Sequence, residues 1–386
     1  MVISILTIND TAMEILNISQ IDTIFANGSY PIEFLLYYKD GLKTRAIRSA
    51  LNSLSSVFWP LFGEYNAGAI HADTYNEADF FDEEVIDRDF DKEEENRKIY
   101  ERYSQVNPSD LKKLFFLKVL QFRNGSVLIP KMNHLAGDGY SYFYFLSALA
   151  DLSKGIHDPV QNNSAASLIK PSHHRTILKE FRYKEIGSKV LADKEEFSIE
   201  FEEIPKATVR SIIKAVASDS IHRISGNDIL SAMVIKKMAG IQKEYSKDDF
   251  QLTIPIDIRR QIKEYGINYF GNGLMFNVTN FKKSDLEKLN ISEIAIEIRK
   301  SMPDISNERY LEYLLSIEII IAQRQSKKLK VYDPRIGCLV TNLSMMPANK
   351  LNFGTGDPDF IFPLTIEKNS AAILSNRDNY ILRLAL

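Results

Sequence analysis

The 386-residue chain contains a single cysteine, Cys338, and a single tryptophan. One cysteine excludes a disulfide framework within the chain and a zinc site built from Cys-x-x-Cys pairs, and it favours a reducing compartment. We interpret Cys338 as a small buried hydrophobic residue, because no Cys/His arrangement for nucleophilic catalysis can be found in the sequence. The formal net charge is only -3, so no basic field is available to attract a nucleic-acid backbone. Nucleic acid is therefore excluded as the main partner.

Long apolar runs are also absent. The best candidate for a membrane span, residues 311–322, is too short and carries two glutamates. The opening residues 1–6 have no basic segment, and polar residues at positions 9 and 10 interrupt their apolar run, so we expect no signal peptide. We therefore expect a soluble, cytoplasmic protein without a membrane span.

The length and composition indicate a large globular protein. A chain of 386 residues exceeds the usual size of one domain, and its 22 Phe and 18 Tyr favour aromatic cores or an aromatic-lined pocket. Residues 154–194 are polar and rich in turn-forming residues, which is typical of a crossover between domains. We predict domains over residues 1–165 and 201–386, joined by a crossover over residues 166–200.

Periodicity predicts helices and strands in both parts. Apolar residues at helical spacing predict a helix over residues 42–58, and another over 140–152. Residues 114–122 and 127–132 are typical of two strands, and Asn124-Gly125 between them indicates a hairpin turn because both residues tolerate positive φ. In the second part we expect helices over 207–216, 227–238 and 308–325, and strands over 251–258, 274–281, 337–343 and 371–374.

The second strand of the hairpin leads directly into the six residues HLAGDG, which begin at His134. A histidine alone at a strand end is usually structural, but its neighbours favour a function here. Gly137 and Gly139 permit tight or positive-φ turns, and Asp138 can anchor the loop through an ion pair. Histidine on such a rigid turn can accept a proton from a hydroxyl or amine and pass it on, because its pKa lies near working pH.

This segment resembles the HxxxDG motif of the BAHD acyltransferases. Four further segments resemble the family in the same order: SGNDILSA at residues 225–232, PIDIRR at 255–260, YFGN at 269–272 and NFGTG at 352–356. The last stands where the family carries DFGWG. Because the five segments span most of the chain, the sequence is identified as a member of this family.

The resemblance implies an α/β fold of two chloramphenicol-acetyltransferase-like domains, each a mixed sheet with helices, with an active-site channel between them. It implies that His134 activates a small-molecule alcohol or amine, which attacks the thioester of acyl-CoA directly in a ternary complex, without an acyl-enzyme. Acyl-CoA is then a co-substrate, and no cofactor is bound permanently. We expect a monomer.

The resemblance also assigns structural residues. Asp138 and Gly139 are expected to hold the loop, with Asp138 facing Arg259. Asn352, Gly354 and Gly356 belong to the second signature, which is mainly structural in the family.

Departures from the family pattern have consequences at two places. Asn352 replaces the usual Asp, so an ion pair there becomes at most a neutral hydrogen bond, and Thr355 replaces the usual Trp. Thr341 falls where the family carries a threonine that approaches the reacting carbonyl, and Leu343 replaces a nearby tryptophan. Thr341 is therefore either a donor to the oxyanion or a β-branched strand residue that only packs.

Two other functions stay open. Carrier-protein-dependent condensation domains usually show HHxxxDG, but Asn133 stands in place of the first histidine. A BAHD-like binding protein without catalysis is disfavoured by His134, Asp138, Gly139 and Arg259. We expect no metal site: the pair His173-His174 lacks a Cys or carboxylate motif, and no motif surrounds His71, His157 or His222.

Overall fold

The computed structural model describes residues 14–26, 32–66, 68–110, 112–155, 197–219, 223–241, 248–262, 265–323, 325, 329 and 331–386. Of the expected crossover over residues 166–200, only residues 197–200 lie within these ranges. His157, His173, His174 and His222 lie outside the described residues, so their expected lack of a role stays a prediction. No helix in the described part of the chain is both long and apolar enough to cross a membrane.

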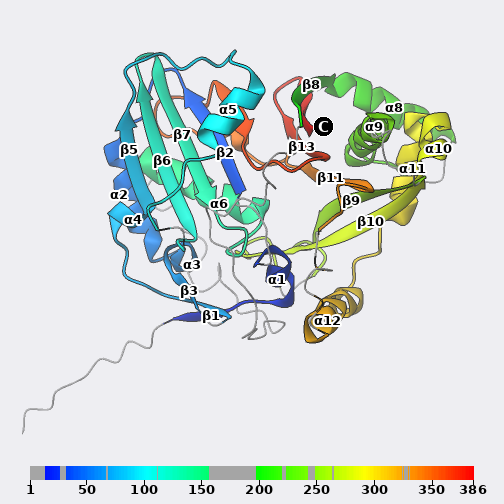
Figure 1. Cartoon of the computed structure of the whole chain (residues 1–386), viewed down its shortest axis with the longest axis horizontal. Coiled ribbons are helices and arrows are strands. Elements are labelled where there is room, and N and C mark those ends of the chain that lie inside the picture. The colour runs from blue at the N-terminus through cyan, green and yellow to red at the C-terminus, as the bar shows by residue number, and fades with distance from the viewer. Residues whose placement is uncertain are drawn as a thin grey trace, which may run out of the picture.

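The first half is built on a five-stranded sheet with the order β12-β2-β7-β6-β5 (Figure 1). Its strands are β2 (Ile32–Tyr38), β5 (Phe81–Val85), β6 (Phe115–Phe122), β7 (Gly125–Met132) and β12 (Phe360–Pro363). α2 (Thr44–Ser55) and α6 (Gly139–Ser153) pack on one face, and α5 (Asn96–Tyr103) packs on the other. Because both faces are covered, β2 and β7 are almost wholly buried.

The helices expected over residues 42–58 and 140–152 and the strands of the hairpin are confirmed, but the turn was placed one residue too late. Phe122 pairs with Gly125, so the turn consists of residues 123 and 124. Asn124 does not adopt a positive φ; its side chain instead forms two hydrogen bonds with the backbone of Phe90. Gly125 has φ 151°, and a Cβ there would lie 2.4 Å from the Tyr38 carbonyl oxygen. Close approach of β2 therefore requires this glycine.

The second half is built on a six-stranded sheet with the order β10-β9-β11-β13-β14-β8. Its strands are β8 (Ile199–Pro205), β9 (Asp249–Asp257), β10 (Leu274–Lys282), β11 (Gly337–Asn342), β13 (Ser370–Ser375) and β14 (Asn379–Ala385). One face is covered by α8 (Lys206–Asp219), α9 (Gly226–Ile241), α10 (Lys283–Lys288) and α11 (Ile291–Ser301). The helices expected over residues 207–216 and 227–238, and all four expected strands, are confirmed within a few residues.

Strand pairing and helix packing also join the two halves. β12 lies late in the chain but pairs with β2 of the first sheet, with Phe360 opposite Tyr37. β8 packs against α5. Below the two sheets in Figure 1, α1 (Gln20–Ala26) packs against α12 (Asn307–Ala322), the helix expected over 308–325. The other elements of the described residues are α3 (Trp59–Phe62), α4 (Glu77–Phe80), η2 (Ala348–Lys350) and the small sheet of β1 (Ile15–Asn17), β4 (Ala69–His71) and β3 (Glu64–Asn66).

Candidate active site

His134 lies in the turn between the end of β7 and the start of α6. Asn133 shapes this turn, since its side-chain oxygen accepts a hydrogen bond from the Leu135 N–H at 2.9 Å. Asp138 then caps α6 by accepting a hydrogen bond from the Ser141 N–H at 3.0 Å, the usual role of aspartate at this position. A buried strand and a capped helix thus hold the imidazole between them.

Packing requires a glycine at position 137 and leaves little room for a side chain at position 139. Neither adopts a positive φ, so that part of the expectation is wrong. A Cβ on Gly137 would lie 2.8 Å from the Cβ of Ser141, and one on Gly139 would lie 3.2 Å from Cδ2 of Leu343. The second contact brings the segment after β11 against the start of α6, so the two halves of the molecule meet at the motif.

Asp138 and Arg259 form the buried ion pair that the resemblance implies. Arg259 donates from Nη1 to Oδ2 at 2.8 Å and from Nη2 to Oδ1 at 2.9 Å. The Gly273 N–H also donates to Oδ2, at 2.9 Å. The two side chains are only 5% and 1% exposed. Both carboxylate oxygens are therefore engaged by the scaffold, and neither is directed to His134.

The protonation of Asp138 follows from this pairing. Burial alone would raise the pKa of its carboxyl group, but the charge and hydrogen bonds of Arg259 outweigh burial and hold that pKa below its usual value. Asp138 is consequently a carboxylate at neutral pH. Its contribution to stability is present above its unfolded pKa and is lost as the pH falls through the folded value.

Asn272 holds the imidazole from the other half of the chain. Nδ1 of His134 lies 3.1 Å from Oδ1 of Asn272. The amide nitrogen of Asn272 donates to the Asp22 carboxylate at 2.9 Å and to the His134 carbonyl at 2.9 Å. Since a carboxylate and a carbonyl only accept hydrogen bonds, the amide oxygen must face the ring, and Nδ1 carries the proton. Nε2 is then the nitrogen that can accept a proton.

Phe25 stacks on the imidazole, with ring centroids 3.6 Å apart and planes 7° from parallel. Burial lowers the pKa of His134 to about 4, and the charge of Asp138 and the hydrogen bond to Asn272 only partly oppose this shift. His134 is nevertheless partly exposed, because it lines a cavity. At neutral pH the ring is therefore uncharged and accessible from the cavity side.

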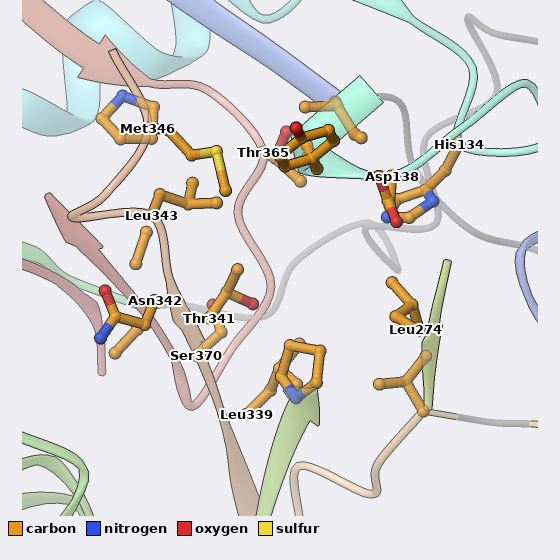
Figure 2. A pocket seen from close by; sticks show the side chains of 18 of the residues that line it. His134, Asp138, Leu274, Leu339, Thr341, Asn342, Leu343, Met346, Thr365 and Ser370 are labelled. Carbon is orange, nitrogen blue, oxygen red and sulfur yellow. The ribbon is translucent and has the colours of Figure 1, made fainter. Parts of the chain in front are cut away.

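A cavity of about 180 Å³ lies between the two sheets (Figure 2). His134, Asp138, Gly139, Arg259 and Thr341 all line it. Thr341 lies at the end of β11, and Figure 2 shows it across the cavity from His134. The other lining residues are mostly apolar, but Thr365, Glu367, Ser370 and Arg383 add a polar stretch of wall.

A second cavity of about 540 Å³ adjoins the first, since Tyr140, Asp257, Arg259 and Met346 line both. The arrangement therefore places a neutral base at one cavity, and a larger cavity lies beside it.

The sequence as a whole agrees with this geometry. A model of the Transferase family matches residues 66–380, which is most of the chain. The chain belongs to the BAHD acyltransferase family. No sequence among the curated proteins matches it.

Solved structures show the same fold at low identity. Vinorine synthase is 16% identical, with 97% of this chain and 91% of that chain covered and a TM-score of 0.74. TRI101 of F. graminearum, in complex with coenzyme A and T-2 mycotoxin, is 13% identical, with coverages of 97% and 95% and a TM-score of 0.74. The first condensation domain of the CDA synthetase is 12% identical, with 98% of this chain and 91% of that chain covered and a TM-score of 0.56. The fold is thus the expected one, with two chloramphenicol-acetyltransferase-like domains.

The second BAHD signature does not line the cavity. Asn352 accepts hydrogen bonds from the N–H groups of Gly354 at 2.8 Å and Gly356 at 3.2 Å, and both glycines have positive φ. Thr355 donates to the Gly41 carbonyl at 2.6 Å. The segment is a tight turn fastened to the chain after β2, so these residues serve the scaffold rather than the wall of the site.

Sequence reasoning missed three groups beside His134. Phe25 and Asp22 belong to an N-terminal helix that was not predicted, and the amide of Asn272 was quoted in a motif without a role. The pattern Ser-x-x-Asp at residues 19–22 is a helix-start signal that could have indicated α1.

Cys338 is fully buried and free, as expected, and burial raises the pKa of its thiol.

We expect Asp138→Asn to lower the free energy of unfolding by about 3 kcal/mol or more, because it leaves the buried charge of Arg259 without its main partner. Urea or thermal unfolding at pH 7 measures this loss. Asp257→Asn is the control: Asp257 also contacts Arg259, at 3.2 Å, but is 45% exposed, so its loss should cost less than about 1 kcal/mol. Equal unfolding of the parent and Asp138→Asn would show that the pair does not stabilise the fold.

Proposed function

We propose that this BAHD protein transfers an acyl group from acyl-CoA to a hydroxyl or amine of a small-molecule acceptor, with His134 as the general base. The observation that carries this proposal is the uncharged His134 ring at the cavity, with Nδ1 bonded to Asn272 and Nε2 left as the proton acceptor. TRI101, which has the same fold, has been crystallised with coenzyme A and deoxynivalenol. The cytoplasmic location and the monomeric state stay predictions from the sequence.

The reaction follows from the position of the base. Nε2 of His134 takes the proton of the acceptor while the acceptor oxygen or nitrogen attacks the thioester carbonyl. The tetrahedral intermediate then expels the CoA thiolate, which takes the proton from the imidazolium and leaves as free CoA. The acyl group passes directly to the acceptor in a ternary complex. Asp138 takes no part in proton transfer, because its oxygens are bound to Arg259 and backbone N–H groups.

The base can be tested by following free thiol release from acetyl-CoA with a panel of alcohols and amines. His134→Ala should lower kcat by about 10²- to 10⁴-fold, the contribution of one general base. His71→Ala is the control: His71 lies in β4 and does not line the cavity, so this change should leave kcat unchanged. Near-normal turnover of a folded His134→Ala protein would refute the assignment.

The pH profile gives a second test. Because the base acts unprotonated and its pKa is lowered to about 4, kcat/KM should rise with pH through about 4 and be level from about pH 6 to 8. A histidine in water would instead place this rise near about 6.5. Short assays started from a neutral stock separate catalysis from acid unfolding. A rise centred near 6.5 would mean that His134 is not withdrawn from water as described.

We also propose that the Thr341 hydroxyl donates a hydrogen bond to the oxyanion of the tetrahedral intermediate. Thr341→Val keeps the side-chain shape and should lower kcat by about 10²-fold with little change in KM. Thr253→Val, a buried threonine of β9 that does not line the cavity, is the matched control. If kcat of Thr341→Val stays within a few-fold of the parent, Thr341 is a packing residue, and a backbone N–H near His134 or Gly137 is the next candidate.

A further inference from the structure

The carboxylate of Asp22, in the first turn of helix α1, accepts hydrogen bonds from two different parts of the structure. Oδ2 of Asp22 accepts hydrogen bonds from the Ser19 N–H at 2.6 Å and from the Ser19 hydroxyl at 2.8 Å, which closes the first turn of the helix. Oδ1 of the same side chain accepts from the amide nitrogen of Asn272 at 2.9 Å. Asp22 and Asn272 are 2% and 0% exposed. The carboxylate therefore links the start of α1 to the residue that contacts His134.

A second helix uses the same cap without this link. At the start of α9, Asp228 accepts from the N–H of Ser225 at 2.6 Å and from its hydroxyl at 2.8 Å. The charged partner of Asp228 is Arg299, not an amide near the active site. Capping a helix thus explains Ser-x-x-Asp in both places, but it does not explain the contact between Asp22 and Asn272.

The orientation of the Asn272 amide depends on that contact. Its nitrogen faces two acceptors, the Asp22 carboxylate and the His134 carbonyl, and its oxygen faces Nδ1. Turning the amide over would place its oxygen against both acceptors and its nitrogen against Nδ1. In that orientation the ring would have to carry its proton on Nε2, and the base would be lost.

α1 also holds the ring directly. Phe25 lies one turn after Asp22 in the same helix and stacks on the imidazole at 3.6 Å. The helix thus restrains the plane of the ring with one side chain and reaches its Nδ1 atom through Asn272 with another. Both restraints come from an element outside the HxxxDG turn.

We propose that Asp22 is a positioning residue of the active site, which fixes the amide of Asn272 and thereby keeps His134 in the tautomer with Nε2 unprotonated. This role in catalysis rests on the proposed function, whereas the effect on the tautomer does not. Asp22→Asn is the sharpest variant. The Ser19 N–H retains the oxygen of the new amide, so its nitrogen faces the nitrogen of Asn272 and favours turning that amide over.

The ¹⁵N chemical shifts of the imidazole report the tautomer without any substrate. Among the six histidines, His134 is assigned by the signal that disappears in His134→Gln. We expect the parent to carry the proton on Nδ1 and Asp22→Asn to shift toward the Nε2–H form. Asp228→Asn makes the same change at the cap of α9 and should leave the His134 shifts unchanged. Parent-like shifts in Asp22→Asn would overturn the proposal.

A double variant tests the direction of the effect. In Asp22→Asn/Asn272→Asp, the carboxylate at position 272 can only accept, so it should restore the Nδ1–H form even if the single variant folds poorly. If both the single and the double variant show the Nε2–H shifts, the proposal is contradicted. If the single variant yields no folded protein, a double variant in the Nε2–H form contradicts it equally.

Kinetics then connect the tautomer to catalysis. Where turnover is measurable, kcat of Asp22→Asn should fall by about 10- to 100-fold, with little change in KM. This is the range found for groups that orient metal-ligating histidines through a hydrogen bond. The double variant should recover part of this loss, because the carboxylate at position 272 accepts from Nδ1 but cannot donate to the His134 carbonyl as the amide does. In the double variant, the rise of kcat/KM with pH should lie at a higher pH than in the parent. The reason is that a carboxylate at position 272 then faces the ring in addition to Asp138. If no acceptor supports turnover, the proposed function fails, but the shifts still decide the role of Asp22.

Discussion

The buried ion pair between Asp138 and Arg259 is the interaction on which the active site depends. It joins the start of α6 in the first half to the end of β9 in the second, and its partners continue into the backbone. Arg259 donates to the Gly271 and Gly273 carbonyls, and the Gly273 N–H returns a hydrogen bond to Asp138. Asn272 lies between these two glycines, so the ion pair sets the position of the residue that contacts His134. Asp138 thus acts on the base through the scaffold rather than through a proton.

Burial of His134 keeps the ring unprotonated at neutral pH but also makes it a weaker base. Withdrawal from water disfavours the cation, so the ring is a free base at neutral pH but a weaker one than histidine in solution. A weaker base must be well placed to be effective, and the amide of Asn272 and the ring of Phe25 supply that placement. In this site, the fixed orientation of the His134 ring compensates for its lower basicity.

Local patterns in the sequence predicted the elements that have a strong period or a clear turn signal, such as α2 and the hairpin of β6 and β7. They missed β2, whose seven residues are all buried and show no alternation, and β12, which pairs far from its place in the chain. The motif predicted Asp138 and Arg259 as partners. It could not predict the contact of Asn272 with His134, because residues 138 positions apart meet only through the tertiary fold.

The second signature shows which departures a scaffold tolerates. Asn352 stands where the family usually carries an aspartate, but its partners here are the N–H groups of Gly354 and Gly356, which need only an oxygen acceptor. The turn is therefore retained with a neutral side chain, and the Thr355 hydroxyl fastens it to the Gly41 carbonyl. At Asp138 the partner is a buried guanidinium, which an amide oxygen would leave uncompensated. The same exchange of carboxylate for amide is thus mild in one motif and severe in the other, because the charge of the partner decides its cost.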